Sequence, residues 1–194
     1  MKKVIKLALV ISFISLMSCS NSDDSAATGS CSSDIPFVQP GKTFTVKVTQ
    51  FGFDAGTIKF DIGNCNGSGF LVTRQAYDAT GTATTSGTDL WKQEGAFLLT
   101  DSNNNGDYFS KIYKKGAALG DTWQITRPTD GAVITHEVID IDSLITVPAG
   151  TFHCKVFKYV NSETINDSYI FWNDEIGQVK EDAGFFTTEL QSYN

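Results

Sequence analysis

The sequence has few of the residues from which catalytic and metal sites are commonly built. Its 194 residues include two histidines, four cysteines and four prolines. His136 and His153 stand apart, without the ligand spacing of a zinc site. No serine lies in a nucleophile-elbow pattern, and no glycine-rich phosphate loop leads from a strand into a helix. The sequence therefore favours a protein that does no chemistry and needs no cofactor, with an unrecognised hydrolase as a remaining alternative.

Positive charge is also scarce. The chain contains 15 basic and 22 acidic residues. Residues 1–18 hold three lysines and no acid, so the rest of the chain has 15 − 3 = 12 basic residues against 22 acidic ones, a formal charge of about −10. An acidic chain without basic clusters argues against nucleic acid as a partner and against electrostatic docking on anionic lipid.

Helical periodicity is missing after residue 18, whereas period-two alternation is widespread. Phe44, Val46 and Val48, for example, alternate with polar residues. The later strand candidates are residues 58–62, 70–77, 89–100, 108–114, 122–126, 133–147, 152–160, 168–172, 177–181 and 185–192. Roughly ten strands at short spacing predict an all-β fold with one antiparallel sheet, and a sheet of that size must curl, split or close. Without repeats or a proline-rich linker, residues 36–194 are expected to form a single β domain.

The N-terminal segment is typical of a secretory signal. Three lysines within the first six residues precede an apolar stretch of about ten residues, which is too short to span a bilayer. The stretch ends in Leu16-Met17-Ser18-Cys19, which resembles the lipobox of bacterial lipoproteins. That resemblance implies cleavage after residue 18 and lipid on the Cys19 thiol. Two or three acyl chains, palmitate among them, would anchor the protein to a membrane without a transmembrane helix.

Residues 19–35 are polar and poor in structure-forming residues, so they are expected to form a flexible tether. The acidic pair Asp23-Asp24 resembles the export tag on surface lipoproteins of Bacteroidota-type bacteria. This resemblance implies the outer membrane and a domain that faces the medium. A periplasm-facing domain, with the tether acting as a plain spacer, remains the alternative.

Three cysteines remain beyond the lipid cysteine, in a compartment that permits disulfides. Cys154 lies on the same strand face as Phe152 and Val156, and we interpret it as a small buried hydrophobe. Cys31 in the tether and Cys65 in an Asn/Gly-rich turn are candidates for a disulfide, although sequence alone cannot fix the pairing.

The segment Asp101-Ser102-Asn103-Asn104-Asn105-Gly106-Asp107 contains the sharpest local motif. Oxygen ligands at Asp101, Asn103 and Asn105, followed by glycine, match the first half of a calcium loop. The twelfth position is Ile112, however, so the bidentate glutamate that closes such a loop is missing. A plain turn between two strands requires the same chemistry and is the favoured interpretation.

The segment Val147-Pro148-Ala149-Gly150-Thr151-Phe152, followed by Tyr169-Ile170-Phe171-Trp172 and Gly177-Gln178-Val179-Lys180, resembles a group of bacterial envelope lipoproteins of uncharacterised function. The resemblance implies a strongly curved antiparallel sheet, a half-barrel or open barrel, and brings no catalytic residues with it. Aromatic side chains on such a concave sheet, Trp91, Trp123 and Trp172 in particular, could stack on sugar rings or line an apolar pocket. Packing within the core is the plainer interpretation.

The function predicted from the sequence is therefore a lipid-anchored, non-catalytic binding module for an apolar ligand or a glycan. The alternative is a structural or accessory partner of a larger envelope complex, which would bind through its exposed face.

Overall fold

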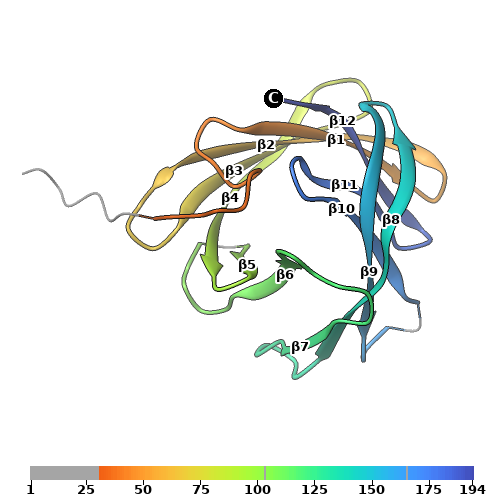
Figure 1. Ribbon diagram of the computed structural model, residues 1–194. Coiled ribbons are helices and arrows are strands. Elements are labelled where there is room, and N and C mark those ends of the chain that lie inside the picture. Colours follow the sequence, from red (N-terminus) through yellow and green to blue (C-terminus); the bar gives the residue numbers. More distant parts are fainter. Residues whose placement is uncertain (1–30, 103, 165) are drawn as a thin grey trace, which may run out of the picture.

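The computed structural model describes residues 31–102, 104–164 and 166–194, and Figure 1 shows this part of the chain as one curved sheet around a central space. The first six strands are β1 (Thr43–Gln50), β2 (Phe53–Cys65), β3 (Phe70–Tyr77), β4 (Ala83–Glu94), β5 (Phe97–Asp101) and β6 (Ser110–Lys114). The second six are β7 (Thr122–Thr126), β8 (Val133–Val147), β9 (Gly150–Asn161), β10 (Ser168–Asn173), β11 (Gly177–Asp182) and β12 (Phe186–Tyr193). The described residues form no helix, and so none that could span a membrane.

The sheet consists of two meanders that run in opposite directions from its centre. The strand order is β6-β5-β4-β3-β2-β1-β12-β11-β10-β9-β8-β7, and every pairing is antiparallel. The first and last strands therefore pair with each other, while consecutive strands β6 and β7 form the two edges. The predicted all-β fold with a single strongly curved antiparallel sheet is confirmed, with twelve strands in place of about ten.

One predicted strand is wrong. Residues 89–100 alternate well enough to suggest a single strand, but the structure divides them between β4 and β5. The chain reverses at Gly95, whose φ of 57° lies in the left-handed region that glycine adopts readily, and Glu94 then pairs with Phe97. A two-residue turn of this kind leaves the period-two pattern almost uninterrupted, so the pattern alone hides it.

The two edge strands meet through side chains. The indole Nε1–H of Trp123 on β7 donates a hydrogen bond of 3.0 Å to the carbonyl oxygen of Lys111 on β6. Near the same junction, Lys114 and Asp121 form an ion pair at 2.8 Å. Trp123 also packs edge-on against Phe97, with ring centroids 5.6 Å apart. These contacts nearly close the sheet into a barrel and protect edges that would otherwise expose unpaired backbone groups.

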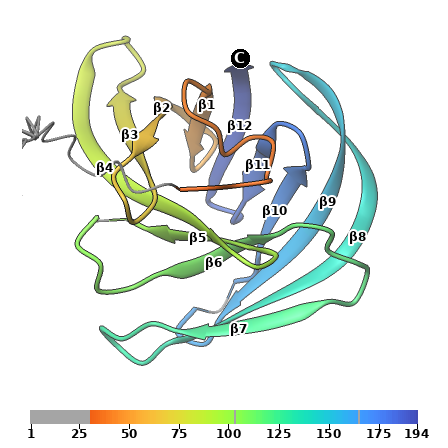
Figure 2. The ribbon, with the colours of Figure 1, turned by 60° about the vertical axis from the view of Figure 1, so that its left-hand side comes forward.

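The segment before β1 lies across the concave side of this barrel. Figure 2 shows this segment, residues 31–41, running across the sheet before the chain turns into β1; we call it the N-terminal strap. Ile35, Phe37 and Val38 are almost fully buried and belong to the main hydrophobic core. The Gly41 N–H then donates to the carbonyl oxygen of Ile62 on β2. Residues 31–35, assigned to the tether from sequence, are therefore packed onto the β domain.

Candidate functional site

A cavity of about 180 Å³ lies on the concave side of the sheet, between the strap and strands from both meanders. Its wall is strongly aromatic and includes Phe37, Phe44, Phe60, Trp91, Trp172 and Phe186. The aliphatic side chains of Val46, Ile58 and Ile112 complete the apolar part. Phe44 and Phe60 face each other across the β1–β2 pair, with rings stacked at a centroid distance of 4.6 Å. Inward-facing positions of the alternating strands thus build an apolar pocket inside the barrel.

One side of the cavity is polar. Glu181 on β11 and Thr188 on β12 are register partners, and Gln178 lies three residues before Glu181 on β11. The Gln178 Nε2–H donates to Thr188 Oγ1 at 3.2 Å and to Glu181 Oε2 at 3.4 Å. Burial raises the pKa of the Glu181 carboxyl, because an apolar surrounding disfavours its charged form.

The strap provides the cavity with part of its wall. Phe37 packs against Tyr113 and Trp172, at centroid distances of 5.1 and 5.7 Å. Gly177 is required at this point for two reasons. Its φ is 101°, and a Cβ on it would lie 3.1 Å from the Phe37 ring. A side chain at Gly177 would therefore displace Phe37 and deform the cavity.

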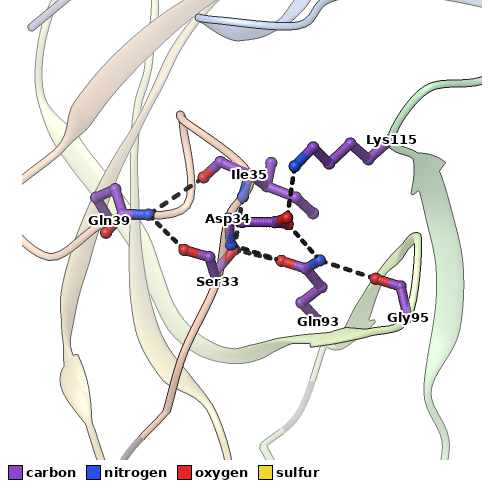
Figure 3. A network of polar contacts seen from close by, with 7 residues as sticks. All are labelled: Ser33, Asp34, Ile35, Gln39, Gln93, Gly95 and Lys115. Atoms are coloured by element: carbon purple, nitrogen blue, oxygen red, sulfur yellow. Dashed lines mark hydrogen bonds and ion pairs between the residues drawn. The ribbon is translucent and has the colours of Figure 1, made fainter.

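Polar contacts fix the strap to the β4–β5 turn and to the end of β6, as Figure 3 shows. Gln93 accepts hydrogen bonds from the Ser33 hydroxyl and the Asp34 N–H, each at 2.9 Å, and donates to the Asp34 carboxylate at 2.6 Å. Lys115 forms an ion pair with the same carboxylate. These partners hold the pKa of Asp34 below its ordinary value, with the Lys115 hydrogen bond as the largest cause. The strap is thus attached by directional bonds as well as by its buried side chains.

A disulfide attaches the strap at its N-terminal end. Cys31 is bonded to Cys65 at the end of β2, with a Cα–Cα distance of 5.6 Å. Both residues lie where the sequence analysis placed a candidate bridge. Cys154 is a free thiol, 1% exposed, as expected for a small buried hydrophobe.

The three tryptophans proposed as a binding surface have different positions. Trp91 and Trp172 line the cavity, whereas Trp123 stacks on the imidazole of His136 at a centroid distance of 4.9 Å. All three are less than 10% exposed, so they form walls and core contacts and offer no open platform for sugars. His136 is 1% exposed, and burial lowers its pKa to about 4.

The candidate calcium loop closes the β5–β6 hairpin. Asp101 Oδ2 accepts a hydrogen bond from the Gly106 N–H at 2.6 Å, and Asn105 Oδ1 accepts one from the Asp107 N–H at 3.0 Å. Both oxygens therefore accept hydrogen bonds that stabilise the turn. Asn103 lies outside the described residues, as does Cys19. Within the described ranges, no group of three or more His, Cys, Asp or Glu residues is arranged to hold a metal ion.

Two surface features bear on the alternative functions. His153 Nδ1 lies 2.6 Å from Asp142 Oδ1, but both side chains are at least 70% exposed, and the pair lies outside the cavity. At two neighbouring hairpin turns, Phe51 and Phe185 stack at 5.7 Å, and Phe53 beside them is 77% exposed. Exposed aromatic side chains of this kind are what the accessory role expected from the sequence would require at an interface.

The polar side of the cavity was missed in the sequence. Val179 and Glu181 occupy the same face of a short alternating strand, and Val179 is fully buried. An acid on the buried face of a strand was the available signal, because carboxylates are rarely buried without a partner. Phe37 was missed because it lies in a segment without strand periodicity.

No protein-family model matches the sequence, and no curated protein matches it significantly. Two solved structures are similar in fold. One is a protein from Bacteroides fragilis NCTC 9343, described as exported and as having a YmcC-like fold, with a TM-score of 0.56 and 17% identity over 80% of this chain and 96% of that one. The other, from Parabacteroides distasonis ATCC 8503 and described as a lipoprotein, has a TM-score of 0.51 and 16% identity over 85% of this chain and 100% of that one. At these identities the likeness shows a shared fold and nothing beyond it.

Proposed function

We propose that this protein is a lipid-anchored envelope protein whose barrel binds a small, mainly apolar molecule in its central cavity. The observation that carries the proposal is the aromatic-walled cavity on the concave side of the sheet, to which the strap contributes Phe37. A cavity of roughly 150 Å³ with apolar walls is large enough to take up benzene. The present cavity, at about 180 Å³, offers room for one aromatic ring with a short substituent.

The proposed anchor is lipid on Cys19, in the outer membrane with the domain facing the medium. The lipobox-like segment and the acidic pair behind it support this placement. So does the fold similarity to proteins described as exported and as a lipoprotein. Incorporation of radiolabelled palmitate tests the anchor: it is expected in the wild type and lost in Cys19→Ser, and equal labelling of both would overturn it. Protease shaving of intact cells tests the orientation, since a domain that is cleaved only after permeabilisation would face the periplasm.

Native mass spectrometry of the protein purified from its own envelope tests the ligand. We expect a bound small molecule at a 1:1 ratio in the wild type. Ile58→Phe, which adds volume within the cavity, is expected to abolish the bound mass. Ile141→Phe is the matched control, because Ile141 on β8 is 49% exposed. If the bound mass persists in Ile58→Phe, or is missing from the wild type, the cavity is not the binding site.

A further inference from the structure

The cavity combines walls of aromatic rings with a carboxyl group. Glu181 reaches the cavity from β11, between the apolar residues contributed by β1 and β2 and the ring of Trp172. An acid placed for solubility would point outward, as Glu189 does one position along from Thr188 on β12, where it pairs with Lys180. The inward position of Glu181 therefore requires an explanation within the cavity.

The protein itself gives this carboxyl little compensation. Its contact with Gln178 Nε2, at 3.4 Å, is at the long limit of a hydrogen bond, and the same amide also serves Thr188. Among the described residues Glu181 forms no ion pair, since the neighbouring Lys180 is paired with Glu189. Glu181 is half-buried. An ionised carboxylate can accept about four hydrogen bonds, and withdrawing it from much of its water without a cation is costly. The Glu181 carboxyl can therefore accept further hydrogen bonds from a molecule bound in the cavity.

The aromatic walls have the complementary property. Faces of tryptophan and phenylalanine rings attract cations through their quadrupole, and cages of such rings are a recurrent means of binding organic ammonium groups. A cation held between rings and carboxyl would gain from both.

We infer that the cavity recognises an organic amine: a compact apolar body of about ten non-hydrogen atoms carrying one ammonium group, which pairs with Glu181. This inference rests on the proposed function and narrows its ligand to one chemical class. The apolar body would contact Phe44, Phe60 and Ile58, and the ammonium would lie near Glu181 and Trp172.

Isothermal titration calorimetry with three matched probes tests the inference. Ethylbenzene, 2-phenylethanol and 2-phenylethylamine share one apolar body and differ in the head group: none, neutral and cationic. We expect the amine to bind the wild-type protein at least ten-fold more tightly than the other two at pH 7. Glu181→Gln keeps the shape of the side chain and removes its charge, so it should weaken the amine at least ten-fold and change ethylbenzene binding less than three-fold. Glu189→Gln, the matched control with the same change in net charge, should leave all three affinities unchanged.

The outcomes separate the two proposals. If ethylbenzene binds and the amine gains nothing over it, or if Glu181→Gln leaves the amine unaffected, the inference fails and the apolar cavity stands. If no probe binds, both fail. Thermal unfolding of each variant shows whether it is folded under the conditions of the titration.

Discussion

The disulfide between Cys31 and Cys65 gives a prediction whose size follows from its position in the chain. It closes a loop with a sequence separation of 34 residues. The loop-closure relation for cross-links then gives an entropic stabilisation of about 3.8 kcal/mol at 25 °C, within the usual range of 2–4 kcal/mol. For a domain of this size, each kcal/mol corresponds to about 2–4 °C in Tm. The variant with both cysteines replaced by alanine should therefore melt about 7–15 °C below the wild type.

The same variant should still fold. The strap remains attached through the buried Ile35, Phe37 and Val38 and through the Gln93 contacts with Asp34. We therefore expect a cooperative transition, observed by circular dichroism, at a lower temperature. The strap should also open more often, so that the Val38 amide, which donates to the Ile35 carbonyl oxygen, exchanges hydrogen faster than in the wild type.

Reduction of the wild type provides the control, because a reductant removes the same bond without changing the sequence. Reduced wild type and double variant should melt within a few degrees of each other. If the double variant melts within 2 °C of the oxidised wild type, the disulfide does not stabilise the fold, because it then restricts neither the unfolded chain nor the strap.

Three further predictions concern buried titratable groups. Cys154 is 1% exposed, and burial raises the pKa of its thiol to about 11. In a protein whose lipid cysteine is blocked, Ellman's reagent should therefore detect no thiol until the protein unfolds. Rapid labelling of the native protein would contradict the burial of Cys154. Burial lowers the pKa of His136 from 6.5 to about 4, so the unfolded state takes up a proton at a higher pH than the folded state does. The free energy of unfolding should therefore fall by about 3 kcal/mol as pH drops from 6.5 to 4. Denaturant unfolding of His136→Phe should lose that part of the pH dependence, and an unchanged profile would show that other groups cause it. The raised pKa of Glu181 has the opposite effect, because the folded state keeps the proton to a higher pH than the unfolded state does. The free energy of unfolding of the ligand-free protein should therefore fall as pH rises above 4.5, and Glu181→Gln should melt at a higher temperature than the wild type at pH 7. A lower Tm for Glu181→Gln would mean that the protein stabilises the carboxylate.

The fold was largely predictable because strand alternation is a local property. Thr122–Thr126 and Val133–Val147 were predicted with the bounds that the structure has. The pairing of β1 with β12 was not, since it joins residues about 140 positions apart and no local pattern specifies it. The turn at Gly95 was also not predicted, because a two-residue turn is too short to interrupt the alternation of apolar and polar residues.

The candidate site was predictable only in part. Trp91 and Trp172 were named as candidates together with Trp123, because aromatic side chains on a concave sheet can line an apolar pocket, although core packing was the favoured interpretation. Phe37 and Glu181 were not, since their roles depend on the strap crossing the barrel and on the inward register of β11. Both are tertiary features, and the sequence of each segment read by itself does not specify them.

A crystal structure of the protein soaked with 2-phenylethylamine would show whether the cavity binds an organic amine. We expect electron density for the probe inside the barrel, with its ring between Phe44, Phe60 and Trp91 and its nitrogen within hydrogen-bond distance of the Glu181 carboxylate. In Ile58→Phe crystals treated in the same way, that density should be missing. Density confined to the outer surface, or a cavity filled only by ordered water at a saturating concentration of the probe, would show that the cavity does not bind the amine.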